Sequence, residues 1–256
     1  MSLLEFKRIA RANRLAASDQ QYVLLEKYVG LLLDWNAKIN LISRRDQENV
    51  WFAHVLHSVS PWFFVELGQG LRVLDLGTGG GLPGIPLAIL RPDLRLTLLD
   101  SIRKKTDAVQ QMVGELGLAN VLVVTGRAEE IARQGVHRHS YDVVVARAVA
   151  KLSDLAAWCR PLLKQRRPYG ESMPRGSSGR PGAEPVMELP PASPGIFPGR
   201  IRIDGPCLLT LKGGDLGGEI REAAVKGAQA RVVPLVFPGA EEIGLEEKKL
   251  VIVAGR

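Results

Sequence analysis

The sequence predicts an α/β protein in which a doubly wound, mostly parallel sheet follows a helical N-terminal extension. Short apolar runs typical of strands alternate with helical stretches from Leu71 onward. The first four runs are far enough apart for crossover helices, which favours parallel pairing. A glycine-rich turn follows the first run. These runs are LRVLDL (71–76), LRLTLLD (94–100), VLVVT (121–125) and YDVVVA (141–146).

Three later apolar runs bring the expected sheet to seven strands. Runs that are apolar almost throughout indicate strands covered on both faces. We therefore expect one Rossmann-like domain over residues 67–256. The later runs are CLLTLK (207–212), RVVPLV (231–236) and KLVIVA (249–254).

The sequence pattern of residues 1–66 predicts a helical extension. Ser18 with Gln21 three residues later resembles a capping box at the start of one helix. Apolar residues then recur at helical spacing, at Tyr22, Leu25, Val29, Leu32 and Trp35. A second helix is expected to begin after Ser43 and to run towards Trp62.

Residues 166–200 have a different composition from the rest of the domain. They contain half of the sixteen prolines of the chain and interrupt the passage from a helix to a strand. A connection of about 35 residues is unusually long for a compact domain. We expect a disordered insertion. Its five arginines could contact RNA, although a solvated loop without function is the favoured interpretation.

Charge and composition narrow the class of protein. A net charge of +7 and an isoelectric point near 9.6 favour a polyanionic partner such as nucleic acid, although many basic proteins have none. The two cysteines have no paired-ligand spacing, so we predict neither a disulfide framework nor a metal site. With no stretch resembling a signal peptide or a membrane span, we expect a cytoplasmic protein without membrane contact, and a monomer.

The segment VLDLGTGGGLPG (73–84) is the strongest candidate for a ligand site. Gly77, Gly79 and Gly81 lie where a strand ends and a helix begins, where glycine allows a ligand to approach the backbone. Residues 79–84 also satisfy the dinucleotide pattern G-x-G-x-x-G. Asp100 ends the second strand, where a carboxylate accepts hydrogen bonds from ribose hydroxyls in either ligand class.

Other residues favour S-adenosylmethionine over a dinucleotide. Asp75 beside the turn suits a cationic cofactor better than a pyrophosphate. Pro83 and Pro86 lack the N–H groups that a phosphate would need. Glu129, after the third strand, is placed to contact an adenine, or else is an acid favoured by the start of a helix.

The sequence closely resembles the RsmG (GidB) family of bacterial methyltransferases, which make 7-methylguanosine in 16S ribosomal RNA. The resemblance covers residues 31–164 and 208–253. It is carried by WNAKINLISRRD (35–46), HVLHS (54–58), LDLGTGGGLPGIPLAILRPD (74–93), LLDSIRKK (98–105), GRAEE (126–130), ARAVA (146–150), LKG (211–213) and KKLVIV (248–253).

This resemblance implies a class I methyltransferase fold, S-adenosylmethionine as the cofactor, a substrate and a set of contacts. The substrate is a guanosine in the decoding-region hairpin of 16S rRNA, met as free rRNA or in the small ribosomal subunit. The chain departs from the family at His57, where an aspartate is common, at Lys248, where an arginine is common, and in the insertion. The implied cofactor contacts are Gly77, Leu82, Ala128, Glu129 and Arg147.

The chemistry of guanine N7 agrees with the residues present. This nitrogen has a lone pair and no proton, so alignment and desolvation are sufficient and we nominate no proton-transfer residue. Methylation of an exocyclic amine would call for an Asn/Asp-Pro-Pro-aromatic run, whereas the segment after the fourth strand reads ARAVAKLSD. Cytosine C5 methylation would need a cysteine nucleophile. Cys207 opens an apolar strand and is better interpreted as a buried side chain.

Arg147 ends the fourth strand, where ligands of doubly wound sheets bind. Our hypothesis is that it frames the cofactor and the incoming base or phosphate, the alternative being a structural ion pair. Lys38, Arg44 and Arg45 are candidate rRNA phosphate contacts, or else a solvated surface. His54 is a further candidate for rRNA contact or helix packing. The other function classes left open are a ribosome-associated binding protein without catalysis and an NAD-dependent oxidoreductase.

Overall fold

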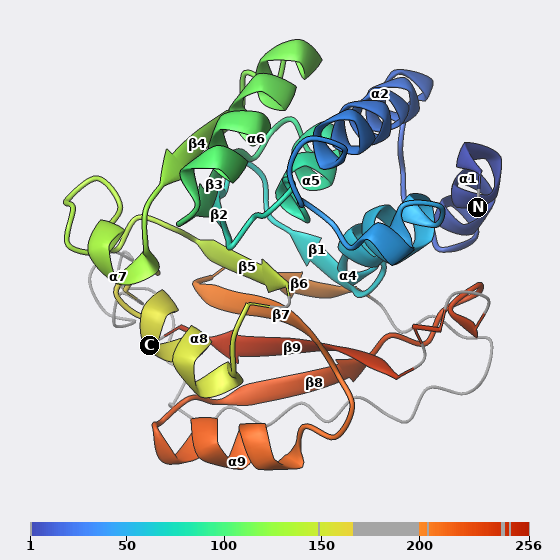
Figure 1. Cartoon of the computed structure of the whole chain (residues 1–256). Coiled ribbons are helices and arrows are strands. Elements are labelled where there is room, and N and C mark those ends of the chain that lie inside the picture. Colours follow the sequence, from blue (N-terminus) through green and yellow to red (C-terminus); the bar gives the residue numbers. More distant parts are fainter. Residues whose placement is uncertain are drawn as a thin grey trace, which may run out of the picture.

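The computed structural model describes residues 2–147, 149–165, 200–203, 205–241, 244–245 and 247–255. A seven-stranded sheet lies at its centre in the order β4-β3-β2-β5-β7-β9-β8. All pairs are parallel except those of β9, which runs antiparallel to β7 and β8 (Figure 1). The predicted fold class is therefore confirmed. The strands are β2 (Arg72–Leu76), β3 (Arg95–Asp100), β4 (Val121–Thr125), β5 (Val143–Arg147), β7 (Cys207–Gly213), β8 (Ala230–Pro234) and β9 (Lys248–Ala254).

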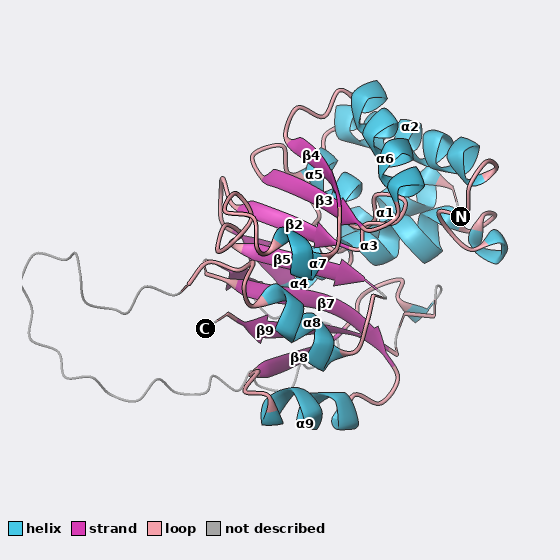
Figure 2. Ribbon diagram, turned by 60° about the vertical axis from the view of Figure 1, so that its left-hand side comes forward, coloured by secondary structure: helices cyan, strands magenta, loops and turns pink. Residues whose placement is uncertain are grey.

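Helices cover both faces of this sheet, as Figures 1 and 2 show. Alternate residues of a strand enter different apolar clusters: Val73 packs with the N-terminal helices, whereas Leu74 packs against the opposite layer. One layer contains α1 (Leu3–Ala12), α2 (Asp19–Asn36), α5 (Gly84–Leu90) and α6 (Arg103–Leu116). The other contains α7 (Ala128–Ile131), α8 (Leu152–Cys159) and α9 (Gly217–Val225).

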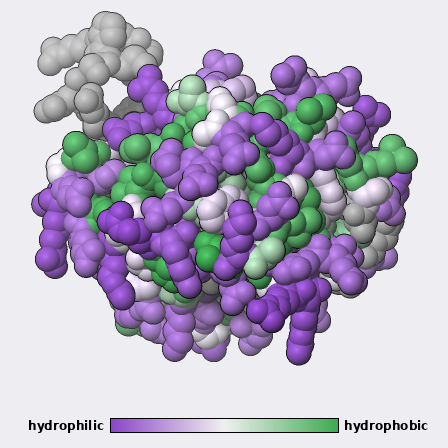
Figure 3. Space-filling view, turned by 45° about the horizontal axis from the view of Figure 1, so that its top comes forward, coloured by the Kyte–Doolittle hydropathy of each residue, from purple (hydrophilic) through white to green (hydrophobic). Residues whose placement is uncertain are grey.

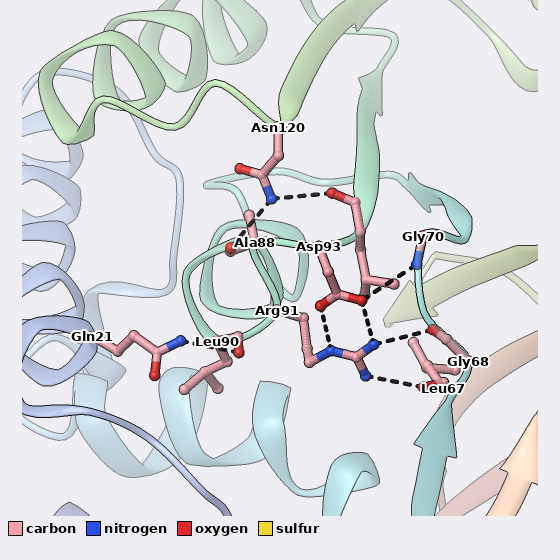
Figure 4. A network of polar contacts seen from close by, with 10 residues as sticks. Gln21, Leu67, Gly68, Gly70, Ala88, Leu90, Arg91, Asp93 and Asn120 are labelled. Atoms are coloured by element: carbon pink, nitrogen blue, oxygen red, sulfur yellow. Dashed lines mark hydrogen bonds and ion pairs between the residues drawn. The ribbon is translucent and has the colours of Figure 1, made fainter.

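The start of α2 is fixed by side chains, as the sequence predicted. The Ser18 hydroxyl accepts a hydrogen bond from the N–H of Gln21, and the Gln21 side chain accepts one from the N–H of Ser18. The amide nitrogen of Gln21 also donates to the carbonyl oxygens of Ile89 and Leu90, at 2.8 and 3.1 Å (Figure 4). One side chain therefore caps two helix ends and attaches α2 to the helix that follows the glycine turn.

The turn after α5 is held by an ion pair. Nε and Nη2 of Arg91 each donate to a carboxylate oxygen of Asp93 at 2.7 Å. The same guanidinium donates to the carbonyl oxygens of Leu67 and Gly68, and Asp93 accepts from the N–H of Gly70 (Figure 4). Together these bonds join α5, the start of β3 and the chain entering β2.

Two local expectations in residues 1–66 were wrong. The helix expected after Ser43 is broken into a 3₁₀ turn, η1 (Arg44–Asp46), a π-helical segment, η2 (Trp51–Leu56), and two short helices, α3 (His57–Val59) and α4 (Pro61–Phe64). The arginine at the end of β5 donates to two carbonyl oxygens of η2, and this tertiary contact competes with regular helical bonding.

The second difference is a small sheet that the sequence did not predict. β1 (Val65–Leu67) pairs in parallel with β6 (Ile201–Ile203), so Val65 and Glu66 are strand residues rather than the end of the helical extension. Three-residue strands separated by more than a hundred positions leave no periodic signal. Of the insertion predicted at 166–200, residues 166–199 lie outside the described residues. Within the described part of the chain, no helix is both long and apolar enough to cross a bilayer.

Candidate active site

The sheet topology brings the predicted site residues to one edge. From β2 the chain crosses to β3 and β4 on one side and to β5 on the other, so a crevice opens where the carboxyl ends of these strands meet. A cavity of about 290 Å³ lies there. It is lined by Leu76, Gly77, Leu99, Asp100, Ser101, Gly126, Arg127, Ala128, Glu129, Arg147, Val149 and Trp158.

The glycine turn has the backbone that its composition predicts. Gly77, Gly79 and Gly81 have φ values of +73°, +57° and +91°, which residues other than glycine rarely adopt. A Cβ atom on Gly77 would also lie 2.7 Å from a methyl carbon of Val149. Gly77 therefore leaves the room that the Val149 side chain occupies, whereas Gly79 and Gly81 shape the turn.

Hydrogen bonding in the turn argues against a dinucleotide. Gly77 and Thr78 donate to the carbonyl oxygen of Leu99, and Gly79 donates to the Asp100 carboxylate. A pyrophosphate needs several free N–H groups at this point. The turn instead uses most of its donors within the protein, at Gly77, Thr78, Gly79, Gly81, Leu82 and Gly84.

Asp75 supports the glycine turn from the interior of the protein. It is fully buried, and its Oδ2 accepts hydrogen bonds from the Thr78 hydroxyl at 2.7 Å and the Gly84 N–H at 2.8 Å. Burial raises its pKa to about 6, while these hydrogen bonds and the charge of Arg147 act in the opposite direction. Asp75 is absent from the cavity lining, so it holds together the turn that faces the ligand. Leu82, also buried, belongs to the same turn.

Asp100 faces the cavity and also organises its wall. Its Oδ2 accepts from the N–H of Gly79 at 3.0 Å and its Oδ1 from the N–H of Ile102 at 2.9 Å. A carboxylate has about four acceptor sites, so two bonds leave capacity for ribose hydroxyls. Beyond Asp100, the exposed carboxylate of Glu129 and the buried Ala128 line the cavity from the first turn of α7.

Arg147 closes the cavity on the side of the N-terminal helices. Its guanidinium lies 3.2 Å from Nδ1 of His54 and 3.5 Å from the carbonyl oxygens of Ala53 and His54. Burial lowers its pKa, and no carboxylate of the described residues lies within ion-pair distance of it. A buried cation without a paired anion favours an anionic ligand group nearby.

The sequence matches the GidB family, described as rRNA small subunit methyltransferase G, over residues 21–169. The chain belongs to this family. The matched segment includes the whole glycine turn and every residue of the cavity lining. This membership agrees with the resemblance found in the sequence motifs.

Individual members of the GidB family are similar over most of the described residues. The ribosomal RNA small subunit methyltransferase G of Rubrobacter xylanophilus is 46% identical over 159 residues, which are 62% of this chain and 60% of that protein. The protein of the same name from Chlorobium limicola is 39% identical over 211 residues, 82% of this chain and 76% of that protein. The corresponding Geobacillus thermodenitrificans protein is 40% identical over 164 residues, 64% and 69% of the two chains.

Two of the three departures from the GidB family, at positions 57 and 248, lie in one place in the structure. His57 lies at the start of α3, and Lys248 opens β9. Burial, together with the positive charges of Arg147 and Lys248, lowers the pKa of His57 to about 3. Nε2 of His57 is buried and has no hydrogen-bond partner among the described residues. The two departures therefore affect the same buried region beside Arg147.

Replacement of His57 by glutamine is expected to reduce the acid sensitivity of folding. The folded protein holds His57 neutral, whereas the unfolded chain protonates it near its ordinary pKa of about 6.5. The contribution of neutral His57 to the unfolding free energy is therefore fully present above pH 6.5. It is lost as the pH falls towards the pKa of His57 in the folded protein. Between pH 6.5 and 5 the wild type should lose about 2 kcal/mol more unfolding free energy than His57→Gln.

Urea unfolding at the two pH values measures this difference. His139→Gln, at a partly exposed position on the far side of the sheet, is the matched control and should follow the wild type. Parallel pH dependence in wild type and His57→Gln would contradict the prediction.

The candidate rRNA contacts separate into two groups. Lys38, Arg44 and Arg45 are exposed, and Lys38 lies over the ring of Trp35 with 4.7 Å between its ammonium and the ring centre. His54 instead is 9% exposed and faces Arg147 and Asp46. We therefore assign His54 no direct RNA contact. Hydrophilic side chains cover most of the face shown in Figure 3, with apolar side chains scattered among them.

Seven residues of the cavity lining were not singled out from the sequence, namely Leu76, Leu99, Ser101, Gly126, Arg127, Val149 and Trp158. Ser101 and Arg127 follow strand ends, Val149 follows β5, and Trp158 projects from α8. Helical periodicity could have indicated Trp158, because its neighbours Leu155 and Cys159 are buried against the sheet. Cys207 is buried at the start of β7, and burial raises its pKa to about 12, as expected of an inert core thiol.

Proposed function

We propose that this chain transfers a methyl group from S-adenosylmethionine to N7 of a guanosine in the decoding-region hairpin of 16S rRNA. The observation that carries the proposal is the cavity at the carboxyl ends of β2 to β5, which lies wholly within the segment matched to the GidB family. The names of its relatives, ribosomal RNA small subunit methyltransferase G, support an RNA substrate.

The residues present fit this cofactor. Asp100 has free acceptor capacity for the two ribose hydroxyls, and Ala128 and Glu129 border the place for an adenine. Gly77 lines the cavity without a side chain, so the methionine part can pass beside the backbone there. Arg147 offers a buried positive charge to its carboxylate or to an RNA phosphate. When bound, S-adenosylmethionine supplies an electrophilic methyl group.

Guanine N7 requires little acid–base chemistry from the protein. Its lone pair lies in the ring plane and carries no proton, so the protein has only to align the base and exclude water. The titratable side chains of the cavity lining are Asp100, Arg127, Glu129 and Arg147. Asp100, Glu129 and Arg147 have binding roles in the proposal, and none of the four is needed to remove a proton.

Methyl transfer from radiolabelled S-adenosylmethionine to unmethylated small ribosomal subunits tests the function, with the product nucleoside identified by mass spectrometry. Label in 7-methylguanosine is the expected result, and free 16S rRNA run in parallel identifies the preferred form of substrate. Label in another nucleoside would overturn the site assignment. Cofactor binding without label would favour a ribosome-associated binding protein.

The exposed basic residues of the N-terminal extension (1–66) are proposed to face the rRNA. A double variant, Arg44→Ala with Arg45→Ala, should flatten the salt dependence of RNA binding, reducing the slope of log K against log salt by about 1.4 to 1.8 for two phosphate contacts. Filter binding at several salt concentrations measures this slope.

Arg133→Ala with Arg138→Ala is the charge-matched control for that experiment. Both of these side chains are exposed, and they belong to the segment around α7, away from the N-terminal helices (Figure 1). If both double variants change the slope equally, the basic residues at 44 and 45 act only through net charge.

A further inference from the structure

Three polar side chains from three separate elements meet beside the cavity. Asp46 ends η1, His54 lies in η2 and Arg147 ends β5. Nδ1 of His54 lies 3.2 Å from Nη2 of Arg147, and its Nε2 lies 3.4 Å from Oδ2 of Asp46. The imidazole therefore stands between a carboxylate and a guanidinium, with one ring nitrogen towards each.

The chemistry of these groups determines the position of the proton on His54. A guanidinium has only donors, so Nδ1 of His54 must accept and carries no proton. The proton of the neutral ring then resides on Nε2, the nitrogen that faces the acceptor oxygen of Asp46. Burial, with the charge of Arg147, lowers the pKa of His54 to about 4, so the ring stays neutral at physiological pH.

We propose that Asp46 and His54 are positioning residues that hold the Arg147 guanidinium at the mouth of the cofactor cavity. The role of Arg147 in binding rests on the proposed function, whereas the geometry of the three side chains does not. Arg147 fixes the tautomer of His54, which presents the lone pair of Nδ1 to Nη2 of Arg147. The Asp46 carboxylate lies 3.4 Å from the protonated Nε2 without a hydrogen bond of good geometry, so it orients the ring by electrostatic attraction. The N-terminal extension thereby controls a side chain of the central sheet.

The backbone of η2 supports the same function. Its carbonyl oxygens at Ala53 and His54 both accept from Nη1 of Arg147, so one guanidinium is held at two nitrogens by a single π-helical segment. Such segments are rare and recur at functional sites. The other titratable groups that influence this cluster are Tyr28, Asp75, His57 and Lys248.

Two isosteric variants of His54 separate positioning from packing. In His54→Asn the amide oxygen replaces Nδ1 and can accept from Arg147, whereas in His54→Gln the amide reaches the position of Nε2, towards Asp46. We expect His54→Gln and His54→Ala to weaken S-adenosylmethionine binding by about tenfold or more, and His54→Asn to remain within about threefold of wild type. Isothermal titration calorimetry without RNA measures these affinities.

Thermal unfolding of the ligand-free variants provides the structural readout. His54→Asn, His54→Gln and His54→Ala should lose comparable stability. If only His54→Asn keeps its affinity for S-adenosylmethionine, the loss in the other two variants comes from the position of Arg147 and not from unfolding. Equal affinities for the asparagine and glutamine variants would overturn the proposal. Because the assay contains no RNA, a wrong methylation target would leave these results unchanged.

The tautomer itself is tested on the wild-type protein. Long-range ¹H–¹⁵N NMR correlations distinguish a protonated from an unprotonated ring nitrogen, and we expect Nδ1 of His54 unprotonated and Nε2 protonated at pH 7. Arg147→Ala removes the donor that requires an acceptor at Nδ1 and should shift His54 towards a mixture of tautomers, whereas Asp34→Ala, at an exposed position on α2, should not. A proton on Nδ1 in the wild type would overturn the proposal even if every His54 variant failed to fold.

Discussion

Replacement of Arg147 by alanine is expected to lower the single-turnover rate of methyl transfer by about 100-fold or more, the scale of a misaligned reacting pair. The guanidinium is the one cation that the described residues bury beside the cavity, and it contacts the N-terminal extension through His54. Its loss removes both the positive charge and the link that aligns the cavity wall. Quench experiments with radiolabelled cofactor measure the rate.

The stability of Arg147→Ala should change much less than its rate. A buried cation with no carboxylate within ion-pair distance among the described residues already carries a desolvation cost, and alanine removes that cost together with three hydrogen bonds. Arg147→Lys keeps the charge but loses the planar set of donors, so it should recover only part of the rate. A fall in melting temperature sufficient to explain the lost rate would instead assign Arg147 a structural role.

Asp100→Ala is expected to weaken S-adenosylmethionine binding by about 10- to 100-fold. In the proposed complex the carboxylate accepts from the ribose hydroxyls, and in the structure it already holds the N–H groups of Gly79 and Ile102. Hydrogen bonds to a charged group contribute about 1.5–3 kcal/mol each, and a loosened turn adds to the loss. Calorimetric titration of S-adenosylmethionine measures the change in dissociation constant.

Two further variants define the cause of the loss at Asp100. Asp100→Asn retains one acceptor oxygen and should bind more tightly than the alanine variant. Asp107→Ala removes an exposed carboxylate from α6, close in sequence but outside the cavity lining, and should bind as the wild type does. Equal weakening by Asp100→Ala and Asp107→Ala would mean that net charge, rather than the ribose contact, controls affinity.

The sequence determined the sheet and one half of the site because their signals are local. Apolar runs such as 94–100 and 121–125 coincide with β3 and β4, since a strand covered on both faces must be apolar almost throughout. The turn required glycines at positive φ, so Gly77, Gly79 and Gly81 could be named in advance. Parallel strand ends then placed Asp100 and Glu129 beside them, whereas Ala128 was implied by the family resemblance.

Only the tertiary structure decided how the other half of the site is assembled. The sequence suggested RNA contact for His54 and a ligand-facing position for Asp75, yet both side chains are buried, His54 against Arg147 and Asp75 beneath the turn. No periodicity indicates that a side chain 93 positions away will bind the carbonyl oxygens of η2. Such pairings depend on how separate elements pack, because burial forces each polar group to find whichever partner the fold brings near.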